Sequence, residues 1–325
     1  MKKRLLCLFM AAVFALFCFS GCHSAKKSAP TVGIAWYADK EYAPVKSVTE
    51  VLDALHCKWV LLEQVVCGKI SYSNGTVAKE ELNEDGYLNA ASAKAVKECA
   101  AADNNAADVM TGIDAVIFAG GEDVGPSLYG YTADWHGIRQ ERDYNATRDV
   151  NDYLLMSYCL EKDIPVLGIC RGMQMLGVVS GASVIQDVPT FFETEKVEYS
   201  YQHRNEGAVP DSDWDYAAHD VTIDDTSSIL YDVYKTNTLM GCPSWHHQAI
   251  LSVLGTPLKA TGYAMTDGIA IIEAIERTDK SFALGIQFHP EAAAVKHMKN
   301  AGNKDDFMSY DTAVLVFDKL IEAAG

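Results

Sequence analysis

Short apolar runs alternate with helically spaced apolar positions along most of this 325-residue chain. The runs of strand length cover residues 31–37, 58–66, 114–119 and 165–169. Helical spacing is found in residues 45–56, 90–102, 148–161 and, after the fourth run, from 171 onward. Strands that are apolar without interruption, and that alternate with helices, are typical of a parallel sheet covered on both faces.

The second half of the chain predicts further strands. Residues 190–220 interrupt the alternation with aromatic and acidic side chains, and Asn74-Gly75 predicts a hairpin earlier in the chain. Strand candidates follow at 220–223, 258–264, 269–275 and 282–288, and a helix at 311–323 closes the chain. Neither a repeat nor an internal linker interrupts this pattern. We therefore predict one three-layer α/β domain over residues 31–325, with a mainly parallel central sheet and helices on both faces.

The first 21 residues differ from the rest. A basic patch, Lys2-Lys3-Arg4, precedes the 15 uncharged residues 5–19 and the small residues Ser20 and Gly21, which is the pattern of a secretory signal peptide. The apolar run is shorter than the roughly 20 residues that a bilayer span needs, although an uncleaved N-terminal anchor is the alternative. We predict a signal peptide over 1–21 and a flexible tether over 22–30.

The end of this segment, Phe19-Ser20-Gly21-Cys22, resembles the lipobox of bacterial lipoproteins. In that family the signal is cut before the cysteine, whose thiol carries a diacylglyceryl group. The resemblance implies an exported lipoprotein that is anchored to a membrane through Cys22 and faces the periplasm or the cell exterior.

Composition and charge exclude several classes of protein. The chain is 49% hydrophobic and 22% charged, so it is neither disordered nor a multi-span membrane protein. Removing residues 1–21 with their three basic side chains takes the net charge from −17 to −20, which argues against nucleic-acid partners. The sequence allows a homo-oligomer without specifying one. Outside the cytoplasm, one pair among five mature thiols could oxidise, and the sequence leaves the choice open: Cys57, Cys67, Cys99, Cys159 and Cys242.

A nucleophile is predicted at Cys170. Gly168-Ile169-Cys170-Arg171-Gly172 follows an apolar strand and opens a helix, which is the cysteine form of the G-x-S-x-G elbow. Small flanking residues permit the sharp turn, and the N-terminus of a helix favours a thiolate. The alternative is a buried structural cysteine.

A base for this nucleophile is predicted at His289. It follows the strand candidate 282–288, at the carboxyl edge of the sheet, where open α/β sheets keep their sites. Pro290 favours an extended conformation at residue 289, which would place the side chains of His289 and Glu291 on the same side. Glu291 could then fix the imidazole tautomer in a Cys–His–Glu relay, whereas a capped helix-start histidine is the alternative.

Taken together, these stretches resemble the class I glutamine amidotransferase fold, and within it the γ-glutamyl-γ-aminobutyrate hydrolase branch, peptidase family C26. The resembling motifs are FAGGEDVGPSLYG (118–130), RD (148–149), PVLGICRGMQMLG (165–177), QDV (186–188), SWHHQA (244–249), DGIAIIEAIE (267–276) and ALGIQFHPE (283–291). The resemblance implies a flavodoxin-like fold, a catalytic triad of Cys170, His289 and Glu291, and an oxyanion hole from the backbone N–H groups of Gly121 and Arg171.

The resemblance also implies a set of substrate-binding residues: Gly120, Gln174, His203, Arg204, His246 and His247. Arg204 could pair with a substrate α-carboxylate or simply solvate an acidic surface. Adjacent histidines in an extended segment point to opposite faces, so we expect no metal at His246-His247. The segment 120–123 lacks the phosphate-loop pattern, and we expect no cofactor.

Three functions compete at this stage. The first is hydrolysis of a small γ-glutamyl amide or γ-glutamyl peptide through a thioester on Cys170. The second is a glutaminase subunit that supplies ammonia to a synthetase, which export of the chain argues against. The third is a catalytically silent binding lipoprotein of the same fold, which the complete triad disfavours.

Overall fold

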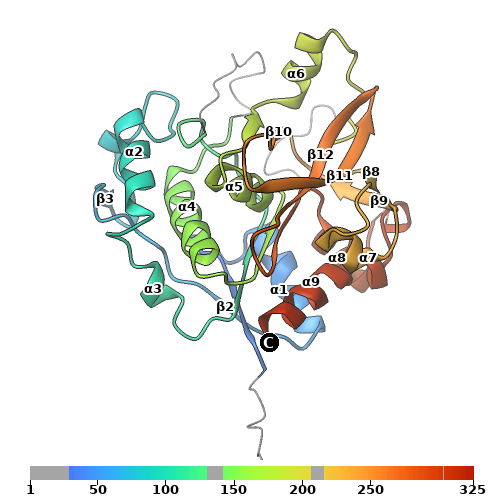
Figure 1. Cartoon of the computed structure of the whole chain (residues 1–325), viewed down its shortest axis with the longest axis horizontal. Coiled ribbons are helices and arrows are strands. Elements are labelled where there is room, and N and C mark those ends of the chain that lie inside the picture. Colours follow the sequence, from blue (N-terminus) through green and yellow to red (C-terminus); the bar gives the residue numbers. More distant parts are fainter. Residues whose placement is uncertain (1–28, 130–141, 206–215, 303) are drawn as a thin grey trace, which may run out of the picture.

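The computed structural model describes residues 29–129, 142–205, 216–302 and 304–325, which fold around an eleven-stranded sheet (Figure 1). Five of its strands are parallel neighbours and lie in the order β2-β1-β5-β6-β13, with β2 at the edge. Their bounds are Lys58–Leu61, Thr31–Ile34, Ala115–Phe118, Val166–Ile169 and Ala283–Ile286. This is the 2-1-3-4-5 order of a doubly wound fold, so the predicted parallel centre is confirmed.

Beyond β13 the sheet continues with antiparallel strands, three of which coincide with the strand candidates at 220–223, 258–264 and 269–275, although the sequence did not indicate their direction. The order is β12 (Ile269–Arg277), β11 (Leu258–Thr266), β8 (Ala217–Ile223) and β9 (Thr238–Ser244). Two short strands, β7 (Ser183–Ile185) and β10 (Ala249–Ser252), attach through β12.

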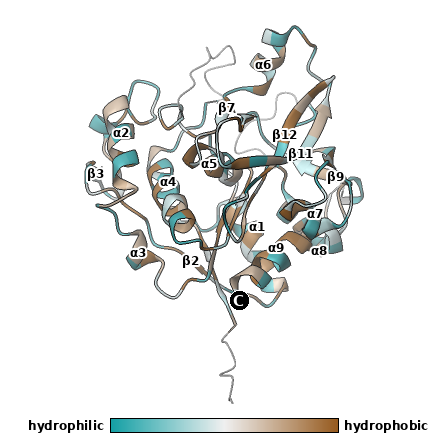
Figure 2. Cartoon of the chain, in the orientation of Figure 1, coloured by the Kyte–Doolittle hydropathy of each residue, from teal (hydrophilic) through white to brown (hydrophobic). Residues whose placement is uncertain are grey.

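Burial explains why the two halves of the sheet differ in sequence. Every residue of β5, β6 and β13 is buried, because helices cover both faces there. In β8, buried and exposed residues alternate strictly, as expected for a strand with one covered face. In Figure 2 the helices α4 and α9 carry both hydrophobic and hydrophilic residues, as expected for helices that turn one face to the sheet.

The helices form two layers. One layer contains α1 (Ala43–Ala54), α8 (Pro290–Lys299) and α9 (Tyr310–Ala324), and α7 (Ile229–Tyr234) packs on α9. The other contains α2 (Ala90–Cys99), α3 (Ala106–Val109), α4 (Ala146–Glu161) and α5 (Arg171–Val179). A main hydrophobic core lies on each side of the sheet, and α6 (Val188–Glu195) covers a smaller third cluster. Among the described residues, no helix combines the length and the apolar character that crossing a bilayer requires.

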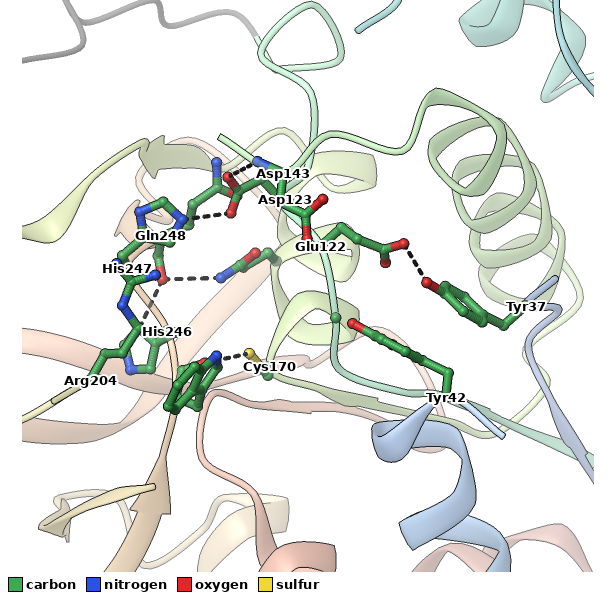
Figure 3. A pocket seen from close by; sticks show the side chains of 13 residues that line it. Tyr37, Tyr42, Glu122, Asp123, Asp143, Cys170, Arg204, His246, His247 and Gln248 are labelled. Carbon is green, nitrogen blue, oxygen red and sulfur yellow. Dashed lines mark hydrogen bonds and ion pairs between the residues drawn. The ribbon is translucent and has the colours of Figure 1, made fainter. Parts of the chain in front are cut away.

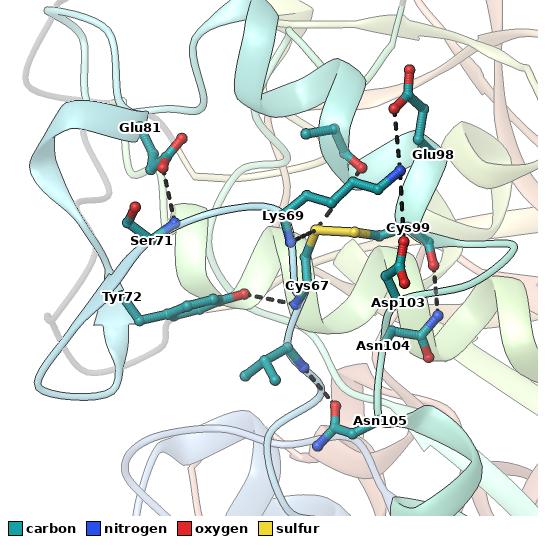
Figure 4. The surroundings of a disulfide bond; sticks show 12 residues. Cys67, Lys69, Ser71, Tyr72, Glu81, Glu98, Cys99, Asp103, Asn104 and Asn105 are labelled. Atoms are coloured by element: carbon teal, nitrogen blue, oxygen red, sulfur yellow. Dashed lines mark hydrogen bonds and ion pairs between the residues drawn. A yellow bond between two sulfur atoms is a disulfide. The ribbon is translucent and has the colours of Figure 1, made fainter.

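A hairpin and a disulfide bond stabilise the segment between β2 and α3. The turn Asn74-Gly75 has positive φ at both residues and joins β3 (Tyr72–Ser73) to β4 (Thr76–Val77), as its sequence predicts. Cys67 is bonded to Cys99 at the end of α2 (Figure 4). This resolves the pairing that the sequence left open, since Cys57, Cys159, Cys170 and Cys242 are thiols. The predicted signal peptide, Cys22 and most of the tether lie outside the described residues.

Candidate active site

Cys170 occupies a strained turn between β6 and α5. Its φ of 51° and ψ of −106° lie in a region that non-glycine residues rarely adopt. The flanking glycines make this approach possible: a Cβ on Gly168 would come within 2.4 Å of the Gly172 carbonyl oxygen, and one on Gly172 within 2.1 Å of the Phe118 carbonyl oxygen. The strand-to-helix elbow predicted from the sequence is therefore present.

His289 and Glu291 come from the end of the neighbouring strand β13. Pro290 begins α8, and His289 Nδ1 lies 2.6 Å from Glu291 Oε1, with both side chains buried. Burial lowers the pKa of His289, but the charges and hydrogen bonding of Glu291 and Cys170 outweigh it and raise that pKa to about 10. The structure thus brings Cys170, His289 and Glu291 together in one buried cluster.

The Gly120-Gly121 turn follows β5 and is held by Arg148 on α4. The Arg148 guanidinium donates to the carbonyl oxygens of Ala119 and Gly120, each at 2.8 Å, and pairs with Glu122 at 2.6 Å. Gly121 has a φ of 142°, and a Cβ there would lie 2.0 Å from Arg148 Nη1. Arg148 therefore fixes the turn that contains one of the two predicted oxyanion-hole residues.

A second buried arginine supports the elbow itself. The side chain of Arg171 is fully buried and pairs with Asp149 at 2.6 Å and with Asp152 on the same helix, α4. Burial raises the pKa of Asp149 to about 7, although Arg171 acts in the opposite direction. The Arg-Asp motif at 148–149 thus joins α4 to both the Gly121 turn and the Cys170 turn. The sequence alone did not indicate that this motif holds the two turns.

A pocket opens beside Cys170 at the carboxyl edge of the parallel strands (Figure 3). Its volume of about 180 Å³ exceeds the space that one water needs by an order of magnitude, so it can hold a group of amino-acid size. Its lining includes Cys170 and these polar or aromatic residues: Tyr37, Tyr42, Glu122, Asp123, Asp143, Gln174, Arg204, Trp245, His246, His247 and Gln248. The Cys170 thiol donates to the Trp245 carbonyl oxygen at 3.7 Å.

Two of the lining residues, both tyrosines, were not predicted from the sequence. Tyr37 and Tyr42 follow β1, and their rings stack with centroids 4.2 Å apart. The Tyr37 hydroxyl donates to Glu122 at 2.7 Å. Their position directly after a parallel strand could have indicated a place in the site, because the carboxyl ends of parallel strands meet at one edge of the sheet.

His247 lines the pocket between two carboxylates. Its Nε2 lies 2.8 Å from Asp123 and its Nδ1 lies 3.2 Å from Asp187. Burial lowers the pKa of His247, but the two carboxylates outweigh this effect and raise it to about 9. Both ring nitrogens face acceptors, so the imidazole is cationic at neutral pH.

The other predicted substrate-binding residues are not equivalent. Arg204 and Gln174 line the pocket, and the Gln174 amide donates to the Gln248 carbonyl oxygen at 3.0 Å. His246 borders the pocket, but its ring nitrogens face the Gln248 carbonyl oxygen at 2.8 Å and Glu273 at 3.5 Å. His246 and His247 thus point to different partners.

His203 differs from the prediction. It is absent from the pocket lining, and its fully buried ring lies between Thr266 and Glu273. Its neighbour Arg204 lines the pocket instead. Gly120 is likewise absent from the pocket lining and packs against His289, which a Cβ on Gly120 would meet at 2.7 Å.

Comparisons with known proteins give the relatives of this chain. A model of the Peptidase C26 family matches residues 77–291. Protein NtpR of Enterococcus hirae is 35% identical over 200 residues, which cover 60% of this chain and 74% of that protein. The γ-glutamyl-γ-aminobutyrate hydrolase PuuD of Escherichia coli is 28% identical over 180 residues, covering 55% of this chain and 64% of PuuD.

One solved structure is a weaker match. The glutaminase domain of Trypanosoma brucei CTPS aligns at 18% identity over 91% of this chain and 94% of that domain, with a TM-score of 0.45. The family match spans most of the chain and includes both the elbow and the His289–Glu291 pair. The chain therefore belongs to the peptidase C26 family of hydrolases, among the class I glutamine amidotransferase-like proteins.

Proposed function

We propose that this protein hydrolyses the γ-amide bond of small γ-glutamyl compounds, through a γ-glutamyl thioester on Cys170. The observation that carries the proposal is the buried Cys170–His289–Glu291 cluster beside a pocket of amino-acid size. Membership of a hydrolase family, and a 28% identical relative named γ-glutamyl-γ-aminobutyrate hydrolase, support it. The leaving group is an amine such as γ-aminobutyrate, or a peptide.

The first half of the reaction forms the thioester. The Cys170 thiol gives its proton to His289 Nε2, the sulfur attacks the γ-carbonyl carbon to form a C–S bond, and the carbonyl oxygen becomes an oxyanion. When the C–N bond breaks, His289 gives its Nε2 proton to the departing amine. Glu291 accepts the Nδ1–H hydrogen bond throughout, which holds the ring and stabilises its charged form.

The second half returns the enzyme to its starting state. Water attacks the thioester while His289 takes one of its protons, the C–S bond breaks, glutamate leaves, and the Cys170 sulfur receives the bonding electrons and the proton from His289. In both halves the oxyanion would be stabilised by the N–H groups of Gly121 and Arg171. Arg171 is the first residue of α5, where backbone N–H groups have no acceptor within their own helix.

The pocket offers the charges that a free glutamyl head group requires. A γ-glutamyl group keeps an α-ammonium and an α-carboxylate, so a matching site needs an anion and a cation. Arg204 supplies a guanidinium that suits a carboxylate, and Asp143 supplies a carboxylate to the pocket lining, apart from Arg204 (Figure 3). Glu122 is committed to Arg148, which holds the pKa of the Glu122 carboxyl near 2 despite burial.

We also propose that the enzyme works outside the cytoplasm, attached to a membrane by lipid on Cys22. The lipobox-like end of the N-terminal segment is the main support. The Cys67–Cys99 disulfide is independent support, because such bonds persist mainly in oxidising compartments.

The test of the activity is a panel of γ-glutamyl amides, γ-glutamyl peptides and glutamine, with released amines read by mass spectrometry. We expect amine release by the wild-type protein, none by Cys170→Ala, and a γ-glutamyl mass adduct on the Cys170 peptide. Release of ammonia from glutamine alone would support a glutaminase instead. Complete inactivity, or an adduct on another cysteine, would overturn the proposal.

A further inference from the structure

Three histidines and one glutamate meet in the antiparallel part of the sheet. His219 lies on β8 and Glu273 on β12, while His203 and His246 lie in the segments that precede β8 and follow β9. All four side chains are buried, and their ligand atoms lie within 4.8 Å of one another. The residues are separated by up to 70 positions in the sequence, so no local spacing reveals the group.

The group converges on a single oxygen atom. Glu273 Oε1 lies 3.2 Å from His203 Nδ1, 3.6 Å from His219 Nε2 and 3.5 Å from His246 Nε2. Within the described part of the chain, none of these three nitrogens and neither oxygen of Glu273 has a partner in hydrogen-bonding geometry. Five polar atoms of buried side chains therefore face one another without a hydrogen bond between them.

The opposite nitrogen of each ring is already engaged. His246 Nδ1 faces the Gln248 carbonyl oxygen at 2.8 Å, and His219 Nδ1 faces the Asp220 carbonyl oxygen at 3.4 Å. A carbonyl oxygen only accepts, so each of these rings carries its proton on Nδ1 and presents the Nε2 lone pair to Glu273. His203 Nε2 is paired with the Thr266 hydroxyl at 2.8 Å. Such outer hydrogen bonds orient the histidines of metal sites in the same way.

Lone pairs that face a buried carboxylate repel it unless something positive lies between them. Within the described part of the chain, both oxygens of Glu273 are buried without a hydrogen-bond partner, which is costly for a carboxylate. A positive charge among the four side chains would remove this cost.

We propose that His203, His219, His246 and Glu273 bind a divalent transition-metal ion, and that this ion is zinc. Three imidazole nitrogens and one carboxylate oxygen form a donor set that zinc accepts. In a tetrahedral site with bonds of about 2.0–2.1 Å, neighbouring ligand atoms lie about 3.3 Å apart. The three distances to Glu273 Oε1, from 3.2 to 3.6 Å, are close to that edge, and all four ligand atoms lie within 4.8 Å of one another.

The site is structural rather than catalytic. Four protein ligands fill a tetrahedron and leave no position for water or substrate. His246 adjoins Trp245, whose carbonyl oxygen accepts from Cys170, and His247, which lines the pocket. Backbone bonds strengthen this connection, because the His246 N–H donates to the His203 carbonyl oxygen at 3.0 Å. The ion would therefore fix the part of the pocket wall that contains His246 and His247.

The test is metal binding by the purified wild-type protein. We expect one equivalent of zinc by elemental analysis, a lower melting temperature after chelation, and recovery when zinc alone is added back. Cobalt substitution should give the visible absorption of a tetrahedral ion. X-ray absorption of the zinc-loaded protein should show nitrogen and oxygen neighbours only. A sulfur neighbour, or no stoichiometric zinc, would overturn the proposal.

Variants locate the site. Glu273→Gln keeps the volume of the side chain and removes the anionic ligand, so we expect at least a tenfold loss of zinc affinity. His219→Ala should behave similarly, whereas His56→Asn, at an exposed position, should bind zinc as the wild type does. Cys170→Ala should also retain the metal. Unchanged zinc affinity in both Glu273→Gln and His219→Ala would contradict the assignment, and so would loss of zinc in Cys170→Ala. If Glu273→Gln and His219→Ala do not fold, the X-ray absorption spectrum of the zinc-loaded wild-type protein decides.

Discussion

The guanidinium of Arg148 occupies the space that a side chain on residue 121 would need. A Cβ on Gly121 would lie 2.0 Å from Arg148 Nη1, while Nη2 of the same group donates to the Gly120 carbonyl oxygen at 2.8 Å. Arg148, which fixes the turn, therefore also leaves room only for glycine at position 121. This relationship connects a buried ion pair to the geometry of the proposed oxyanion hole.

The Gly121→Ala variant should therefore lose activity beyond any loss of stability. Displacing Arg148 moves the Gly121 N–H, and the loss of one oxyanion donor costs on the order of 10²–10³ in kcat. Gly255→Ala is a matched control, since Gly255 also has positive φ but has open space around its Cβ position. Steady-state kinetics and urea unfolding of both variants test this, and equal kcat values would contradict it.

Glu291 should act only through His289. We expect Glu291→Gln to keep KM within a small factor while kcat falls, on the order of 10- to 10⁴-fold. His289→Ala should fall further, and the double variant should be little worse than His289→Ala, because the two residues act as one unit. Losses that add across this cycle would show that Glu291 works independently.

The charged His247 should make stability depend on pH. Its pKa is raised to about 9 in the folded protein, above about 6.5 in the unfolded chain, so its stabilisation is complete below pH 6.5 and is lost as the pH rises through 9. The free energy of unfolding of wild type should exceed that of His247→Gln by more at pH 6 than at pH 9.5. Asp187→Asn should weaken this dependence, and a difference that grows with pH would contradict the assignment.

Breaking the Cys67–Cys99 bond should destabilise the fold. The bond closes a loop with a sequence separation of 32, for which chain entropy predicts a loss of about 3–4 kcal/mol. Urea unfolding of Cys67→Ser measures this loss, and reduced wild type should match the variant. Cys57→Ser serves as the control because Cys57 is a thiol. Equal stability of Cys67→Ser and oxidised wild type would contradict the prediction.

Replacing Cys22 should detach the protein from membranes. If Cys22 carries lipid, Cys22→Ala should be released to the soluble fraction or remain unprocessed, because several acyl chains anchor firmly and none anchors weakly. Mass spectrometry of the wild-type N-terminal peptide provides the direct measurement. An unmodified wild-type peptide, with Cys22→Ala still in the membrane fraction at high salt, would exclude this anchor.

The sequence by itself determined the parallel centre of the fold and the elbow at Cys170. Both features depend on local sequence. An apolar run of four residues indicates a strand that is buried on two faces, and closely spaced glycines indicate a turn in which there is no room for a Cβ atom. The pairing of His289 with Glu291 was also predictable, because the two residues are two positions apart and Pro290 between them favours a conformation that points both side chains the same way.

Only the tertiary structure decided what the distant residues do. The pairing of Cys67 with Cys99, and the grouping of His203 with Glu273 rather than with the pocket, depend on how separate segments pack. The antiparallel strands β8 and β12 carry His219 and Glu273 to the same place, although 54 positions separate them in the sequence. Side-chain periodicity indicates which face of a strand is buried, but the partner across the sheet is set by strand order, which no local pattern records.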